Sequence, residues 1–237
     1  QGEGLRERKG LPEHASTMGA ACSAETGVAK PLPEVIGGKI KAIYLDTKTP
    51  TGVQVMSRGL HTSALLECAG ADYEMGWLNF GDWENLKWSA TVFGYGPMIE
   101  APDGTKFCEI AAIATFLGTY YPDSLIGVKT PVDFGVASML AVKGAEMYTF
   151  HNNPPHGCTI FTKDMFKDKA MLDASKANFE KEIAPALVAL EKLLKPDGKA
   201  TSTGTSFGEV LMWGTLTQLR HSKMPNCDPF PPKTQKL

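Results

Sequence analysis

The stretch DWENLKWSATVFGYGPMIEAPDGTKFCEIAAIATFL, residues 82–117, predicts the central part of the fold. In it, Gly96-Pro97 precedes a short apolar run. A proline is tolerated at the first residue of a strand, and X-Pro is where cis peptide bonds concentrate. Pro102-Asp103-Gly104 predicts a hairpin turn into a second short strand, and we expect a helix to begin at Glu109. Because free backbone N–H groups at a helix start suit a bound carboxylate, we interpret the stretch as half of a small-molecule site.

The preceding residues complete the pattern of a small mixed sheet with helices. Residues 39–45 begin with alternating polar and apolar residues, which is typical of a strand, and residues 59–69 have apolar residues at helical spacing. Residues 71–78 can form a second strand, and Asp82 can cap a short helix. The order strand, helix, strand, short helix, strand, strand, helix predicts an α/β domain over residues 37–121.

The second half has the pattern of helices throughout. Residues 133–150 are helical in period, and residues 171–194 form a long amphipathic stretch in which Pro185 predicts a kink or a break. Ser206–Glu209 has the pattern of a capping box at the start of a buried helix. No strand pattern is found here, so we expect an all-α domain over residues 126–237.

Composition excludes several function classes. Hydrophobic residues make up 43% and charged residues 21% of the 237 residues, which is typical of a globular protein with a sizeable core. The formal net charge is −2, and Lys and Arg are scattered, so no nucleic-acid partner is expected. No apolar run approaches the roughly 18 residues of a membrane span.

Cysteine usage favours a reducing, cytoplasmic setting. The number of cysteines is odd, no Cys-x-x-Cys pair occurs, and no secretory signal is found. His151, His156 and Cys158 form a metal-like group without a clear fourth ligand, so we expect no metal site. The five cysteines are Cys22, Cys68, Cys108, Cys158 and Cys227.

Residues 1–36 are polar and without periodicity, which predicts a disordered leader. Met18 is followed by Gly19 and, three residues further on, by Cys22. If translation starts at Met18, this sequence matches the myristoylation pattern, with Cys22 placed for palmitoylation. Membrane association is expected only in that case.

Over about residues 38–220 the chain resembles the glutathione transferases, closest to their sigma-like, Tyr-type cytosolic class. The resemblance implies a thioredoxin-like domain that binds glutathione, followed by an all-helical domain. The order and spacing of several short fragments carry it. They are Tyr44 at the end of the first strand, Arg58-Gly59, the Cys68–Glu74 segment similar to AG-x-x-YE, Asp82-Trp83-x-x-x-Lys87, Gly96-Pro97 as a cis-proline pair, and Ser206-x-x-Glu209.

The resemblance also implies roles for these residues. Trp83 and Lys87 would hold the glycyl carboxylate of glutathione, and the backbone of Gly96, before Pro97, would pair with its cysteinyl unit as an added strand does. The γ-glutamyl carboxylate would lie at the helix start, at Glu109 and the backbone of Ile110, with Arg58 as a further binding residue. Tyr44 would donate a hydrogen bond to the glutathione thiolate, which is the nucleophile.

The implied reaction is conjugation of glutathione to small hydrophobic electrophiles, a detoxification activity of a cytoplasmic homodimer. Glutathione would be a co-substrate. Two other functions stay open: a catalytically weak or inactive binding or structural protein of the same fold, as lens crystallins are, and a glutathione-dependent isomerase.

The chain departs from the family within the site itself. Ile110 stands where members usually have Ser, so a hydroxyl bond to glutathione worth about 1 kcal/mol is missing. Leu60 replaces a second Arg, and Tyr95 precedes Gly96 in place of the common Gln, Lys or Leu. The loop between Tyr44 and Arg58 is several residues longer than usual. The helix that normally closes the second domain is not found after residues 228–231.

Several residues have a structural interpretation beside the functional one. Tyr44 can be an ordinary strand aromatic, because β-strands favour Tyr. Ser57 is then the alternative thiol activator, as in Ser-type classes. Trp83 can simply pack, although Trp and Lys four residues apart place two donors on one helix face.

Overall fold

The structure is a computed structural model, in which residues Val35–Leu237 form one compact unit. The leader expected over residues 1–36 lies outside the described residues, as do Met18, Gly19 and Cys22. The structure describes residues 38–46, 57–79, 82, 85, 87, 91–94, 96–152, 169–202, 204–221 and 231–237.

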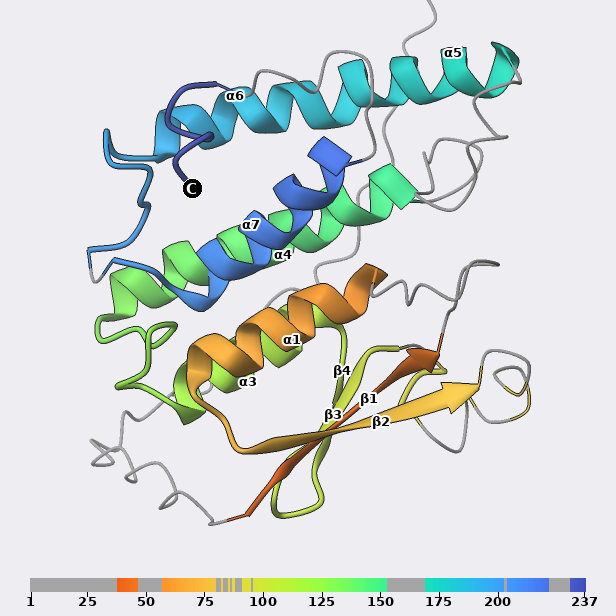
Figure 1. The fold of residues 1–237 in the computed structure, drawn as a ribbon. Coiled ribbons are helices and arrows are strands. Elements are labelled where there is room, and N and C mark those ends of the chain that lie inside the picture. Colours follow the sequence, from red (N-terminus) through yellow and green to blue (C-terminus); the bar gives the residue numbers. More distant parts are fainter. Residues whose placement is uncertain are drawn as a thin grey trace, which may run out of the picture. The chain divides into compact units, whose positions relative to one another are not determined.

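Four strands form one mixed sheet in the order β2-β1-β3-β4 (Figure 1). β1 (Ile40–Asp46) and β2 (Tyr73–Asn79) are parallel, and α1 (Ser57–Ala69) connects them. β3 (Met98–Glu100) pairs antiparallel with both β1 and β4 (Lys106–Cys108). The predicted βαβ and ββα units are therefore confirmed.

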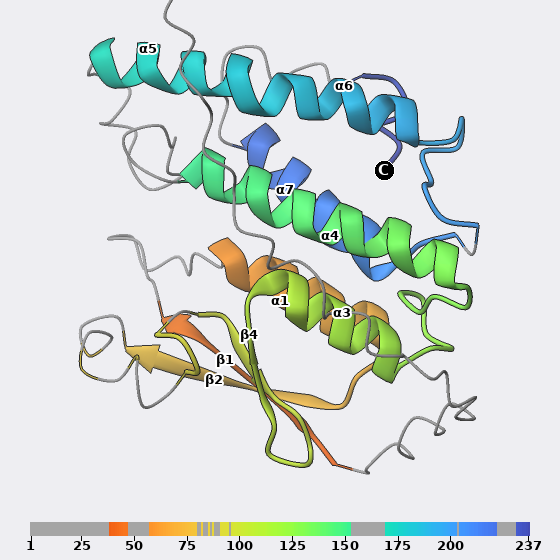
Figure 2. The same ribbon diagram turned by 180° about the vertical axis from the view of Figure 1, so that it is seen from behind.

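Two helices, α1 and α3 (Ile110–Tyr120), lie on the same face of the sheet in both views (Figures 1 and 2). The inward residues of the sheet meet them in one core. The alternation of β1 explains this, because Ile40 and Ala42 are buried while Lys41 between them is exposed. The helix expected to begin at Glu109 begins one residue later, with Glu109 as its N-cap.

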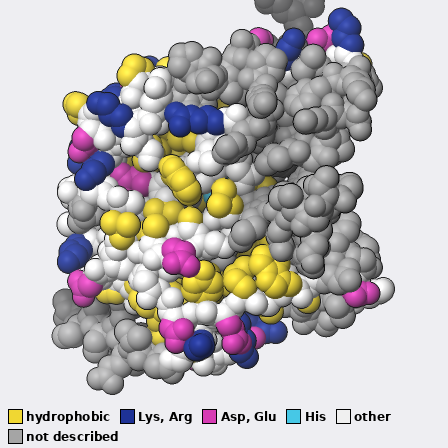
Figure 3. All heavy atoms as spheres, viewed as in Figure 1, with side chains coloured by type: hydrophobic (Ala, Val, Ile, Leu, Met, Phe, Trp, Pro, Cys, Tyr) yellow, Lys and Arg dark blue, Asp and Glu magenta, His cyan; other side chains and the backbone are white. Residues whose placement is uncertain are grey.

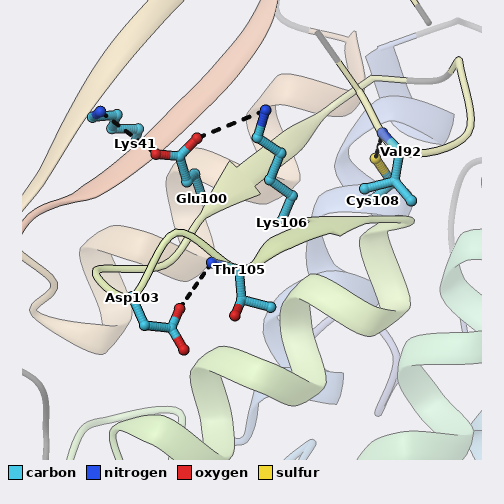
Figure 4. Close-up of polar contacts among 7 residues, drawn as sticks. All are labelled: Lys41, Val92, Glu100, Asp103, Thr105, Lys106 and Cys108. Carbon is cyan, nitrogen blue, oxygen red and sulfur yellow. Dashed lines mark hydrogen bonds and ion pairs between the residues drawn. The ribbon is translucent and has the colours of Figure 1, made fainter. Parts of the chain in front are cut away.

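The β3–β4 hairpin has the predicted turn at residues 102–104. The backbone N–H of Thr105 donates to Asp103 Oδ1 at 2.8 Å. On β3, Glu100 lies between two lysines, with 3.5 Å to Lys41 Nζ and 3.9 Å to Lys106 Nζ (Figure 4). These partly exposed pairs are worth little individually, but they join three neighbouring strands.

The second half is helical, and the described residues after 121 contain no strand, as predicted. α4 (Pro131–Asn152) packs against α7 (Phe207–His221), which also contacts α1 and α3. α5 (Lys169–Asn178) leads into α6 (Ala184–Leu193). A second apolar cluster joins α4, α6 and α7. The boundary between residues 121 and 126 stays a prediction.

Pro185 changes the helix in a specific way. A π-helical turn, Phe179–Ile183, lies immediately before α6, and the N–H of Ala184 donates to the carbonyl of Phe179. Pro185 has no N–H to donate and lies in the first turn of α6, where that donor is not needed. The kink or break predicted here takes the form of a π turn in a chain that stays helical.

The capping box at the start of α7 is formed in part. The backbone N–H of Glu209 lies 3.4 Å from Ser206 Oγ, as the pattern requires. The buried Glu209 carboxylate accepts from the N–H of Ala200, at 2.6 Å, and from the hydroxyl of Thr201, at 3.0 Å. Glu209 therefore ties the preceding loop to α7.

Polar contacts in the core join α1 to the helical half. His61 on α1 is fully buried, and its Nε2 lies 3.1 Å from Thr215 Oγ1 on α7. Thr215 donates its own hydroxyl hydrogen to the carbonyl of Gly144 on α4, at 2.9 Å. Nε2 of His61 is therefore the donor in the first bond, and one chain of hydrogen bonds connects three helices.

The last described segment, residues 231–237, forms a turn against α6. The carboxylate of Glu191 accepts from the backbone N–H groups of Lys233 and Thr234, at 3.0 and 2.9 Å, and from the Thr234 hydroxyl. Burial alone would raise the pKa of Glu191, but these hydrogen bonds outweigh it and place the pKa below its usual range.

Gly118 is required where α3 meets α7. A Cβ at this position would lie 2.2 Å from Cδ1 of the buried Phe207. We expect Gly118→Ala to lower the free energy of unfolding by about 1–3 kcal/mol, because the core would be overpacked. Gly135→Ala in α4 is the matched control, since its Cβ would meet nothing within 4 Å. It should raise stability by about 0.5–1 kcal/mol. Urea unfolding measures both, and equal effects would contradict this packing.

Glu191 should make the docking of the last turn pH-dependent. A carboxyl whose pKa is lowered on folding stabilises the structure above its unfolded pKa, and this contribution disappears as the pH falls through the folded pKa. We therefore expect Glu191→Gln to increase amide hydrogen exchange of residues 233–234 at neutral pH. The difference from the wild type should vanish in acid. Glu180→Gln, at an exposed position, is the control, and an equal effect of both changes would contradict this role for Glu191.

Candidate glutathione site

A cleft lies where the hairpin, α3, α1 and α4 meet. The register of the hairpin creates it: Met98 is opposite Cys108, so the residue before β3 lies beside the residue after β4. Its enclosed part measures about 30 Å³, room for about one water molecule. A tripeptide would therefore have to lie along its open edge. The lining residues are Arg58, Gly96, Pro97, Glu109, Ile110, Ala145, Tyr148 and Thr149.

Gly96 and Pro97 form one wall of this cleft. The peptide bond between them is cis, as the resemblance implies. Pro97 is buried and Gly96 is half-buried. Cys108 Sγ accepts a hydrogen bond from the backbone N–H of Val92 at 3.3 Å, and Figure 4 shows this contact between the chain before Gly96 and the end of β4.

Glu109 also lines this cleft, in an unusual backbone conformation. Its φ is 68° and its ψ is 121°, which is uncommon for a residue other than glycine. Such conformations cost about 1–3 kcal/mol and persist where the surrounding structure imposes them. Here the hairpin and α3 impose it, because the Glu109 carbonyl accepts the first N–H bond of α3, from Ile113 at 2.9 Å. The Glu109 side chain is exposed.

The start of α3 provides backbone donors without a side-chain hydroxyl. Ile110 is only 5% exposed and belongs to the core under the sheet. Its backbone N–H is at the first turn of the helix, where the positive end of the dipole favours an anion. The arrangement can bind a carboxylate through backbone groups alone.

Arg58 supplies the positive charge that lines the cleft. Its Nη2 donates to Thr149 Oγ1 at 3.4 Å, and its guanidinium carbon lies 5.4 Å from the centre of the Tyr148 ring. Tyr148 in turn contacts the buried His61 edge to face, at 5.1 Å between ring centroids. The hydrogen bond to Thr149 and the cation–π contact with Tyr148 thus help to hold the guanidinium.

Sequence reasoning did not assign Ala145, Tyr148 and Thr149 to the site. The helical period of residues 133–150 identified Ala145 and Tyr148 only as part of an apolar face. The apolar period of this helix was therefore visible in the sequence. The same period is found in a helix that faces a core and in one that lines a cleft, and only the position of the helix against α1 distinguishes the two.

Tyr44 lies beside the cleft and does not line it. Its hydroxyl accepts a hydrogen bond from the backbone N–H of Arg58 at 3.1 Å, and the residue is 6% exposed. Its ring touches the first turn of α1 so closely that a Cβ on Gly59 would lie 2.8 Å from Tyr44 Cδ1. The hydroxyl therefore caps the start of α1. Its catalytic role stays a prediction.

The remaining predicted residues are described only in part. Ser57 is the first residue of α1, and its side chain lies outside the described residues, as does all of Trp83. Lys87 is helical and half-buried, and its carbonyl accepts from the N–H and the hydroxyl of Thr91, at 3.0 and 2.7 Å. The loop with Cys158 also lies outside. Among the residues that the structure does describe, no group of three His, Cys, Asp or Glu side chains is placed to hold a metal ion.

The chain was compared with known proteins. It matches no protein-family model, and no curated protein sequence matches it. Solved structures do match, among them the glutathione S-transferase from Ascaris lumbricoides. The identity is 19% and the TM-score 0.65, over 84% of this chain and 89% of that chain. The chain has the glutathione S-transferase fold.

Other similar structures share this fold at low sequence identity. One is monomeric Na-GST-3, a glutathione S-transferase of Necator americanus, with 19% identity and a TM-score of 0.60 over 84% of this chain and 89% of that one. Another is prostaglandin synthase D of Nilaparvata lugens, with 14% identity and a TM-score of 0.56 over 77% and 81%. The predicted thioredoxin-like sheet followed by helices is therefore confirmed as a glutathione S-transferase fold. Within the described ranges, no helix is long and apolar enough to cross a membrane.

Proposed function

We propose that the protein binds glutathione and transfers it to small hydrophobic electrophiles as a sigma-like, Tyr-type glutathione transferase. One observation carries this proposal: the Gly96-Pro97 backbone, the start of α3 and Arg58 line one cleft. An extended peptide edge beside a helix N-terminus fits a tripeptide that has a carboxylate at each end.

Each part of glutathione would have a partner in this arrangement. The cysteinyl unit pairs with the backbone of Gly96, and the γ-glutamyl carboxylate lies at Glu109 and the N–H of Ile110. Trp83 and Lys87 donate to the glycyl carboxylate. Because the enclosed volume is small, most of the ligand lies along the open strand edge.

The chemistry follows from a stabilised thiolate. Tyr44 donates its hydroxyl hydrogen to the sulfur, which favours the ionised thiol, the proton being released to solvent. The thiolate then forms a bond to an electrophilic carbon, and a leaving group such as halide departs with its bonding electrons. The side chains of Tyr148, which is buried, and Ala145, which is half-buried, form an apolar wall for the electrophile on α4.

Two other functions remain as alternatives. The buried, N–H-bonded hydroxyl of Tyr44 and the missing hydroxyl at Ile110 favour a protein that binds glutathione with little turnover. Similarity to the prostaglandin synthase D structure favours an isomerase on the same fold. Both alternatives use the same cleft as the proposed transferase. They therefore differ from it in the reaction catalysed and not in the binding of glutathione.

Retention of the full chain on immobilised glutathione, followed by conjugation assays with an aryl halide, tests the proposal. We expect retention and turnover in the wild type. Tyr44→Phe should stay bound but lose at least tenfold in kcat/KM, about 1.4 kcal/mol, because it no longer donates to the thiolate. Tyr121→Phe, which removes a hydroxyl outside the cleft, should change neither the retention on glutathione nor kcat/KM.

The outcomes separate the alternatives. Retention without turnover of any electrophile leaves the binding protein, and isomerisation without conjugation leaves the isomerase. Full turnover in Tyr44→Phe, with loss in Ser57→Ala, would move the catalytic role to Ser57. If the wild type is not retained at all, the proposed ligand is wrong.

We further propose that the protein is a cytoplasmic homodimer that associates through α4. Three apolar side chains on α4 are 51–75% exposed, namely Val132, Met139 and Val142. Residues three and seven positions apart share a helix face, so Met139 and Val142 continue the face that Val132 begins. Light scattering should give twice the chain mass, and Val142→Glu should halve it, whereas Val188→Glu on α6 should not. A monomeric wild type, as the Necator americanus protein is described, would contradict this.

A further inference from the structure

His61 is a polar side chain of the core that does not itself line the cleft at Gly96-Pro97. Figure 3 shows hydrophobic side chains at the surface over α7 and α1, and His61 has no exposed surface of its own. Removing the ring nitrogens of an imidazole from water costs free energy unless they find partners in the protein. An apolar side chain would fill the same space without that cost, which favours a role for His61 beyond filling space.

Two neighbouring helices fix the position of the His61 imidazole. Its Nε2 donates to Thr215 Oγ1 on α7 at 3.1 Å, and Thr215 donates to the carbonyl of Gly144 on α4 at 2.9 Å. A Cβ on Gly214 of α7 would lie only 2.6 Å from His61 Cδ2, so the ring lies directly against the backbone of that helix. A hydrogen bond and close packing therefore both hold the imidazole against α7.

His61 also contacts the aromatic ring that lies beside Arg58. The rings of His61 and Tyr148 meet edge to face, with 5.1 Å between their centroids and 89° between their planes. The guanidinium carbon of Arg58 lies 5.4 Å from the centre of the same Tyr148 ring. Arg58 and His61 are three residues apart on α1 and therefore share a helix face. The Tyr148 ring thus joins a buried imidazole to the cation that lines the cleft.

We propose that His61 is a positioning residue of this cleft, which acts through the ring of Tyr148 to fix the guanidinium of Arg58. An arginine side chain has several rotatable bonds, and fixing it before a ligand arrives removes an entropic cost from binding. That the fixed charge favours a carboxylate of glutathione rests on the proposed function. The fixing itself is a property of the ligand-free chain and can be measured without glutathione.

Nuclear magnetic resonance of the ligand-free full chain tests the position of Arg58 directly. With carbon-13-labelled arginine, the δ-methylene resonance of Arg58, assigned through Arg58→Lys, should be shifted by the ring current of Tyr148. Tyr148→Leu should abolish this shift, whereas Tyr148→Phe, which keeps an aromatic ring, should preserve it. His61→Leu should reduce the shift at least twofold although Tyr148 is intact. An Arg58 resonance that is unchanged in His61→Leu would overturn the proposal.

The affinity for glutathione shows whether His61 acts through Arg58. His61→Leu should weaken glutathione binding, measured by calorimetry, at least fivefold. In an Arg58→Met background the same change should alter the affinity less than twofold, because the residue through which His61 acts is then absent. An equal loss in both backgrounds would overturn the proposal, since His61 would then support the fold in general and not Arg58.

Gly118→Ala is the control for lost stability. It overpacks the contact between α3 and α7, so it should unfold at a lower urea concentration and still bind glutathione with the affinity of the wild type. Binding weakened in Gly118→Ala as much as in His61→Leu would overturn the specific role of His61. If the wild type does not bind glutathione, the proposed function is wrong, and the resonance of Arg58 alone decides whether His61 positions it.

Discussion

The antiparallel pairing of β3 with β4 is the constraint on which the candidate site depends. Because Met98 is opposite Cys108, the backbone that precedes β3 and the residue that begins α3 meet at the same end of the hairpin. A slip of one residue would turn the buried Met98 and Ile99 over and would also separate the two walls of the cleft. Core packing and site geometry are therefore fixed by the same register.

Helix α1 connects the sheet, which includes this hairpin, to the helical half of the fold. In its first turn the backbone N–H of Arg58 donates to the Tyr44 hydroxyl, and the Arg58 side chain lines the cleft at Gly96-Pro97. In its middle, His61 joins the hydrogen-bond chain with α7 and α4. The last turns of α1, together with α7 and residues 236–237, line a second cleft. The two clefts thus lie at opposite ends of one helix that is buried between the sheet and the helical half.

Local patterns in the sequence predicted the elements well because each depends on near neighbours. The alternation of β1 and the Pro-Asp-Gly turn have causes within a few residues, whereas the cis pair at Gly96-Pro97 was implied by the family resemblance. The comparison with solved structures confirmed the fold that these elements form. The helical face of α4 was also visible, but its period could not show that Tyr148 and Thr149 close a cleft instead of a core.

Features that depend on distant partners could not be predicted in this way. The hydroxyl of Tyr44 accepts from Arg58 because a strand end meets a helix start across a long loop. Glu209 fits a local capping box, yet its carboxylate holds a loop before the helix. The last turn docks on Glu191, about forty residues earlier, through backbone groups that have no sequence signature. In each case tertiary contacts determine which of several locally possible arrangements is formed.

The backbone of Glu109 has a further consequence for how this site balances stability against chemistry. A glycine would adopt φ 68° without strain, whereas glutamate incurs a cost of about 1–3 kcal/mol there. The carboxylate is exposed at the rim and contributes no capping bond to α3, so it does not offset that cost within the fold. The protein is therefore less stable with glutamate at this position than it would be with glycine. The exposed glutamate side chain is present at a cost in folding stability.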